Sequence, residues 1–149
     1  MRSLIAGGSL ALLLTFPLAA AELTARLDDG TELARLDVAE GGAWCVLWHH
    51  SVQGFEVKDC YENRAGRMVL VRSHQPDFAA GLGHIPGRGQ QVSDGDGGYW
   101  ILDIDEPVPG DAYVLRVGSL AVDHRLKVGD RIVSLSAQAE HKRVHIALE

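Results

Sequence analysis

The stretch CVLWHHSVQGFEVKDC, residues 45–60, brings together residue types that do chemistry in proteins. It contains both cysteines of the chain, a tryptophan and two adjacent histidines. Three kinds of chemistry fit this composition: a structural disulfide, a metal site, and the nucleophile end of an active site. The compartment of the protein and the spacing of these residues help to decide among them.

The start of the sequence predicts that the chain is exported. Arg2 precedes an apolar run that ends in three alanines, and Glu22 follows. This three-part pattern is typical of a secretory signal peptide, and the apolar run is too short to span a bilayer. We therefore predict a signal peptide at 1–21 and a single domain at 22–149, which is secreted to the periplasm and has no membrane attachment after cleavage.

The two cysteines are predicted to form a structural disulfide. An exported domain with two cysteines normally has one disulfide, because its compartment is oxidising. Fourteen residues separate Cys45 from Cys60, whereas a redox-active pair is separated by two. Closing this ring restrains the unfolded chain and should stabilise the fold by roughly 3 kcal/mol.

If Cys45 and Cys60 face each other on antiparallel strands, the register of a whole hairpin follows. Its turn falls at residues 52–53, with a bulge at Gly54 as the expected adjustment. Side chains alternate across a strand, so one face of the hairpin is the core face. The residues on that face are Trp44, Val46, Trp48 and His50, opposite Tyr61, Asp59, Val57 and Phe55.

The histidines of this hairpin do not make a metal site by themselves. His49 and His50 are adjacent on a strand and point to opposite faces, so they cannot both ligate one ion. His50 faces the core and needs a polar partner. Two interpretations stay open: a neutral histidine bonded to a loop carbonyl, or a residue that borders a pocket closed by the glycine-rich segment 77–98.

That segment runs for 22 residues with seven glycines and no strand pattern. A connection of this length in a compact domain is usually functional or disordered. It contains His84, Arg88 and Asp94, and Trp100 follows it. The Arg88 guanidinium could pair with both oxygens of a carboxylate.

A catalytic arrangement is not evident in the sequence. The available hydroxyls, such as Ser51 and Ser93, lie near histidines but in no nucleophile elbow. Histidines that converge from distant segments could bind zinc or copper, yet no spacing requires it. We predict no cofactor and favour a non-catalytic protein over an enzyme. The alternative is a metal-assisted or serine-type hydrolase using His50, His84 and Asp94.

Short alternating runs separated by turn signals predict an all-β domain. We expect a sandwich or small barrel of about 8–10 mostly antiparallel strands with one long glycine-rich loop. In the last segment Val144, Ile146 and Leu148 alternate, which predicts a strand that closes a terminal hairpin. The ten expected strands are 22–27, 32–38, 43–51, 55–62, 67–73, 99–104, 112–118, 121–126, 131–137 and 141–148.

The charge of the chain excludes some partners. Its formal net charge is −6, and loss of a leader carrying Arg2 makes the remainder more acidic. An acidic domain is repelled by phosphate backbones and by anionic lipid. We therefore expect no nucleic-acid partner.

Four segments together resemble the bacterial family called domain of unknown function 1850. They are HSV at 50–52, DFAAGLGHIPG at 77–87, DGGYW at 96–100 and LRVGSLAVDHRL at 115–126. The family has no assigned activity, so the likeness does not imply one for this chain. It implies a small exported or membrane-tethered protein, often encoded beside a TAXI-type TRAP transporter. The residues that match the family pattern are His50, Ser51, Gly81, Gly83, Arg116, Gly118 and His124.

These observations lead to an expected function. The chain is expected to be a periplasmic, non-catalytic accessory or binding module of a TRAP-type transport system. Its expected partner is a transporter component or solute-binding protein, and its expected ligand is a small carboxylate. The expected ligand-binding residues are His50, Ser51, His84, Arg88 and Trp100. A third possibility is a protein contact made by the apolar residues of the long loop.

Overall fold

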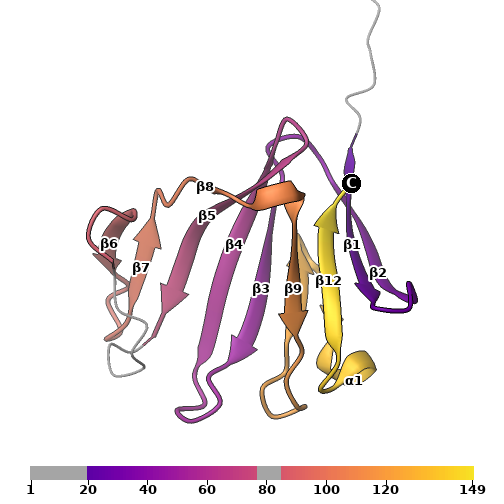
Figure 1. Cartoon of the computed structure of the whole chain (residues 1–149). Coiled ribbons are helices and arrows are strands. Elements are labelled where there is room, and N and C mark those ends of the chain that lie inside the picture. Colours follow the sequence, from indigo (N-terminus) through magenta and orange to yellow (C-terminus); the bar gives the residue numbers. More distant parts are fainter. Residues whose placement is uncertain (1–19, 77–84) are drawn as a thin grey trace, which may run out of the picture.

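The computed structural model describes residues 20–76 and 85–149, which form a sandwich-like single domain of antiparallel strands (Figure 1). Two sheets face each other, and they do not close into a barrel. The predicted all-β class is therefore confirmed, and of its two architectures the sandwich is the one observed. The described residues contain twelve strands, a single turn of 3-10 helix and one short α-helix.

The smaller sheet has four strands in the order β2-β1-β12-β9. Apolar residues alternate along its strands and put one face into the core, as in Leu23 and Ala25 or Val144 and Ile146. β9 forms one edge of this sheet. The strand bounds are β1 (Ala21–Leu27), β2 (Glu32–Val38), β9 (Ala112–Arg116) and β12 (Arg143–Leu148).

The larger sheet has the order β11-β10-β3-β4-β5-β7-β6, with the short β8 paired to β5. In Figure 1, β5, β7 and β6 extend to the left of β9 at the edge of the smaller sheet. The strand bounds are β3 (Ala43–His49), β4 (Glu56–Arg64), β5 (Arg67–Gln75), β6 (Gln90–Ser93), β7 (Tyr99–Leu102), β8 (Glu106–Pro107), β10 (Arg125–Val128) and β11 (Arg131–Ser134).

The core lies between the two sheets. The smaller sheet contributes aliphatic residues such as Leu36 and Leu148, and the larger sheet contributes Trp44, Met68 and Leu126. Each of these side chains is at most 6% exposed. Burial of this apolar surface is the main force that holds the sheets together.

The predicted register of the β3–β4 hairpin is confirmed. Cys45 pairs with Cys60 and Trp44 with Tyr61, and the pairing continues to His49 and Glu56. The disulfide joins the two strands with its Cα atoms 4.0 Å apart. Gly54 follows the turn with φ 74°, in the left-handed region that favours glycine.

Three details differ from the sequence predictions. β6 lies inside the segment for which no strand was expected, and it pairs with β7. The last two residues of the strand predicted at 131–137 instead begin the helix α1 (Ser136–Ala139). β12 is a strand as predicted, but it pairs with β1 and β9 and does not close a terminal hairpin. Its alternating pattern specified a strand without specifying the neighbours.

A fourth difference concerns the strand expected at 121–126. β10 begins only at Arg125, because the preceding residues form a loop in which Asp123 has φ 51°.

The predicted cleavage point after Ala21 stays a prediction. Ala21 is the first residue of β1, where it pairs with Val38.

Candidate functional site

His50 organises the turn of the β3–β4 hairpin. Its Nδ1 accepts hydrogen bonds from the amides of Val52 and Gln53, at 3.3 and 3.2 Å. Its ring lies 5.3 Å from that of Phe55. The expected polar partner therefore exists, but it is a pair of turn amides and not a loop carbonyl. Ser51 is exposed in the same turn.

The other predicted site residues are dispersed over the larger sheet. Arg88 pairs with Glu106, its Nε 2.9 Å from the carboxylate. Trp100 on β7 packs against His74, with ring centroids 4.6 Å apart. His84 lies outside the described residues. No contact among the described residues joins His50, Arg88 and Trp100, and whether any of them binds a ligand stays a prediction.

Asp94, which the hydrolase alternative requires, is bonded to His74. Its Oδ2 lies 2.8 Å from His74 Nε2, and its Oδ1 accepts from the amides of Asp96 and Gly98, each at 2.9 Å. The Asp96 amide first, then His74, and then the Gly98 amide lower the pKa of Asp94. The carboxylate thus closes the 94–98 turn, a common role for aspartate.

A hollow of about 220 Å³ lies between the two sheets. Its walls come from β3 and β4 on one side, and from the edge strand β9 on the other. Such a concave, mostly apolar space with a few polar groups is typical of a small-ligand site. The lining residues are Val46, Trp48, Asp59, Tyr61, Tyr113, Leu115 and His124.

A second hollow of about 210 Å³ adjoins the first, because Tyr61 and Tyr113 line both. It reaches Leu70 and the β8 segment. The 3-10 turn η2 (Pro109–Asp111) follows that segment and leads into β9. We call the two hollows together the inter-sheet cleft.

Aromatic rings form the walls of the cleft. Tyr61 is stacked between Trp44, at a centroid distance of 5.6 Å, and Tyr113, at 5.5 Å. Trp48 is stacked with His124 at 6.0 Å. Stacked rings bury large apolar areas and hold each other's orientation. The cleft is therefore a preformed feature of the fold.

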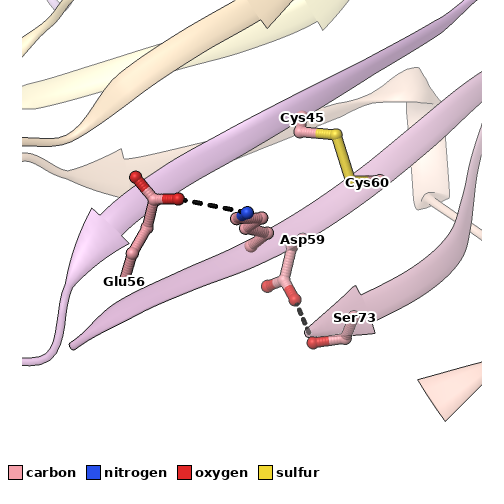
Figure 2. Close-up of a disulfide and its surroundings, with 6 residues drawn as sticks. Cys45, Glu56, Asp59, Cys60 and Ser73 are labelled. Carbon is pink, nitrogen blue, oxygen red and sulfur yellow. Dashed lines mark hydrogen bonds and ion pairs between the residues drawn. A yellow bond between two sulfur atoms is a disulfide. The ribbon is translucent and has the colours of Figure 1, made fainter. Parts of the chain in front are cut away.

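Asp59 is the one carboxyl among the residues that line the first hollow. Its Oδ1 accepts a hydrogen bond of 2.6 Å from Ser73 Oγ, and Ser73 Oγ accepts from Gln75 Nε2 at 3.0 Å. Figure 2 shows Asp59 pointing toward Ser73 and away from the disulfide of the neighbouring Cys60. Burial raises the pKa of Asp59, and Ser73 and the charge of Arg88 oppose that rise.

The two tyrosine hydroxyls of the cleft are protonated. Burial, aided by the charge of Asp59, raises the pKa of Tyr61 to about 12. Burial also raises the pKa of Tyr113 well above its usual value. The Tyr113 hydroxyl is buried, and its polar neighbour is the Tyr61 hydroxyl, which raises the pKa of Tyr113 further without forming a well-aligned hydrogen bond in the described part of the chain. A buried polar group without a well-aligned partner is uncommon and requires an explanation.

His124 is held in the cleft by the loop that precedes β10. Its Nδ1 accepts from the Gly118 amide at 2.9 Å, and its own amide donates to Ser136 Oγ at 2.9 Å. The Nδ1 atom is therefore an acceptor, which places the ring proton on Nε2. Gly118 allows this packing, because a Cβ there would lie 2.7 Å from Val122 Cβ.

Burial lowers the pKa of His124 below its usual 6.5. On acidification His124 therefore takes up a proton more readily in the unfolded chain than in the folded chain. The contribution of His124 to stability is complete above about pH 6.5 and is lost as the pH falls through the window below it. The nearby charge of Asp123 opposes the pKa shift but does not reverse it.

Replacing His124→Asn should therefore flatten the pH dependence of stability, because asparagine keeps an acceptor for the Gly118 amide and does not titrate. Urea unfolding of both proteins at about pH 7 and pH 5 measures this. The wild type should lose more stability on acidification, by at most about 1.4 kcal/mol per pH unit for one proton. Parallel pH profiles would show that His124 does not titrate in this range.

A separate hollow of about 300 Å³ lies on the opposite face of the larger sheet, over the disulfide. Trp100 lines it together with Lys58, Arg72 and Lys127. The Arg72 guanidinium lies 5.3 Å from the centre of the Trp100 ring. This surface could attract an anion, and we call it the outer hollow.

A further hollow of about 350 Å³ lies beside the β1–β2 turn. No aromatic side chain lines it, and its carboxylate Asp28 already lies 2.6 Å from His145 Nε2. Its polar side chains are exposed, so we do not consider it a candidate site.

Metal ligands do not gather in the described regions. Within residues 20–76 and 85–149, no group of three histidine, cysteine, aspartate or glutamate side chains is placed to hold a metal ion. No helix in these same regions is long and apolar enough to cross a membrane.

Comparison with known proteins adds one match. The family model described as Domain of unknown function (DUF1850) matches residues 45–135. This range spans β3 to β11 and includes both cysteines, Asp59, Tyr113 and His124. No curated protein and no solved structure matches the chain.

Proposed function

We propose that this chain, which belongs to the DUF1850 family, is a periplasmic, non-catalytic binding module that holds a small ligand in the inter-sheet cleft. We propose further that it serves a TRAP-type transport system as an accessory. Its partner would be a transporter component or a solute-binding protein. The cleft supports the first part of this proposal. The second part rests on the expectation that members of this family are often encoded beside a TAXI-type TRAP transporter.

The observation that carries the binding role is the pair of polar groups in the aromatic cleft. Asp59 and Tyr113, whose hydroxyl forms no well-aligned hydrogen bond in the described part of the chain, both line the first hollow. Burying such groups costs free energy unless they find partners. A ligand that bonds to them would remove that cost. The same groups would fix its orientation against the aromatic walls.

The lining of the cleft does not favour catalysis. Among the described residues, the lining contains no serine, threonine, cysteine or lysine that could act as a nucleophile. Ser73 is nearby, but its hydroxyl donates to Asp59 and accepts from Gln75. His124 is neutral and accepts from a backbone amide. The only described acceptor of the Ser73 proton is the Asp59 carboxylate, which is a weak base, and no histidine is hydrogen-bonded to Ser73 in the described part of the chain.

A hydrolase is the second candidate, and one observation favours it. His74 and Asp94 form a hydrogen-bonded pair of the kind that orients a catalytic histidine. Its other ring nitrogen, Nδ1, is buried and has no partner in the described part of the chain. A hydrolytic reaction would need a hydroxyl or an activated water at that nitrogen. His74→Gln should then abolish hydrolysis of a reporter ester without unfolding the protein.

Ligand binding can be tested by thermal unfolding of the purified exported protein with a panel of small carboxylates, amines and polyols. A ligand at about 100 times its Kd stabilises a folded protein by about 2.7 kcal/mol. This corresponds to a rise in Tm of several degrees. We expect at least one class of compound to cause such a shift.

Two variants locate the site that binds. Tyr113→Phe removes only the hydroxyl and should abolish the shift. The stability of the free protein should change little, because the buried hydroxyl that is lost forms no well-aligned hydrogen bond in the described part of the chain. Trp100→Ala alters the outer hollow and should leave the shift intact. The opposite pattern would move the site to the outer hollow, and no shift with any compound would contradict the binding role.

The transport association needs a separate experiment. Immobilised protein should retain the solute-binding protein or a membrane component of a TRAP transporter from the same cell, and ligand should alter the amount retained. Retention of neither component would contradict the association and leave the cleft unaffected.

A further inference from the structure

Asp59 differs from the other partly buried carboxylates of the larger sheet. Glu56, on the outer face of the same strand, lies 2.7 Å from Arg125 and 3.2 Å from Lys58. Asp59 forms no ion pair with any described residue. Arg88 is near enough to influence the pKa of Asp59, but its guanidinium is paired with Glu106.

Within the described part of the chain, an ionised Asp59 carboxylate lacks both a cationic partner and most of the hydrogen-bond donors that it could accept from. Its only described hydrogen-bond donor is Ser73, and two carboxylate oxygens can accept about four bonds. Partial burial makes the missing interactions costly, because charge is poorly solvated there. A cation that enters the cleft would supply both the charge and the missing donors.

The surroundings of Asp59 also suit a cation. The aromatic side chains of Trp48, Tyr61 and Tyr113 line the same hollow. The face of an aromatic ring carries partial negative charge and attracts ammonium groups. His124 is neutral in this setting and does not repel a cation. The Tyr113 oxygen, whose neighbour is the Tyr61 hydroxyl, keeps lone pairs free and is a further acceptor for an N–H group.

From this combination we infer that the inter-sheet cleft binds a small organic cation, whose ammonium group pairs with Asp59 between the aromatic walls. The inference rests on the proposed binding function and specifies its ligand class. The carbon skeleton of the ligand would contact Val46 and Leu115. The expected small carboxylate is disfavoured here, because Asp59 would repel it and Arg88 is already paired.

Matched pairs of compounds test the charge directly. Choline and 3,3-dimethylbutan-1-ol differ by the charged nitrogen, and butylammonium and butan-1-ol differ by the ammonium group. Binding can be followed by titration calorimetry and by tryptophan fluorescence, since Trp48 lines the hollow. We expect each cation to bind at least about tenfold more tightly than its neutral counterpart, and added salt to reduce the difference.

Asp59→Asn is the decisive variant. It keeps the shape and an acceptor for Ser73 but removes the charge, and it should lower cation affinity at least about 30-fold. Affinity for the neutral compounds should change little. The folded variant should be at least as stable as the wild type at neutral pH, since an unpaired buried charge has been removed. Asp37→Asn, on the exposed edge strand β2, is the matched control and should change neither property.

Each outcome is informative. Equal binding of cation and neutral compound, or cation binding unaffected by Asp59→Asn, would overturn the cation inference and leave the binding module in place. Preferential binding of carboxylates in the cleft would do the same. If these cations do not bind at all, the inference fails, and the wider compound panel alone then decides the proposed function.

Discussion

Removing the Cys45–Cys60 disulfide by the double substitution Cys45→Ala and Cys60→Ala should lower the free energy of unfolding by about 3 kcal/mol. The bond closes a loop between residues 15 positions apart and restrains the unfolded chain. Alanine avoids placing a hydroxyl at position 60, where the cysteine is only 1% exposed. The folded hairpin should persist, because seven residue pairs hold β3 against β4.

Urea unfolding measures this loss, and reduction provides its control. The wild type unfolded in the presence of a reductant should lose about as much stability as the double variant does. The variant itself should not respond to the reductant. A loss below about 1 kcal/mol would show that the unfolded hairpin is already restrained without the bond. Ligand binding in the inter-sheet cleft should survive, because the disulfide lies on the opposite side of the strand from Asp59, which lines the cleft (Figure 2).

The hairpin shows how much one local constraint can predict. A single assumption, that the two cysteines face each other, correctly specified every pair from Ala43–Glu62 to His49–Glu56. The period of two along a strand then put Trp44, Val46 and Tyr61 on the core face, where they are buried. Register and facing are local properties, so a sequence can specify them.

The cleft could not be predicted from the sequence, because it depends on which strand packs over β4. Tyr61 and Tyr113 are far apart in the sequence, and no pattern within either strand indicates that their rings stack. One local signal was nevertheless present. Asp59 is the one acidic residue on a face that otherwise carries aliphatic and aromatic residues and His50, and the register had already placed it there. A buried charge of this kind is a functional candidate even before its neighbours are known.

The histidines illustrate the opposite error. His50 was singled out because it faces inward, but its Nδ1 serves the amides of its own turn. His124 drew attention only through its match to the family pattern, yet it lines the cleft. Neither residue type nor spacing separates these two cases. The difference arises from loops, whose backbone amides are placed by tertiary structure.

Replacing Trp44→Ala should cost more stability than any other change discussed here, about 3–5 kcal/mol. Trp44 is 1% exposed, and its removal would leave a large cavity between the sheets. Trp44→Phe should cost less than half as much. It keeps an aromatic ring, and it removes an indole N–H that is buried without a partner in the described part of the chain.

Trp44→Ala should also weaken ligand binding, although Trp44 does not contact the ligand. Trp44 does not line the first hollow, but its ring supports Tyr61, whose ring supports Tyr113. Without that support both tyrosines gain freedom, and binding must restrict them again. Met68→Ala, a change of a fully buried residue that lines neither hollow of the cleft, separates this effect from general destabilisation. A cleft ligand can be titrated by calorimetry at a temperature where both variants are folded. We expect weaker binding for Trp44→Ala alone. Equal weakening in both variants would refute the role of the aromatic stack.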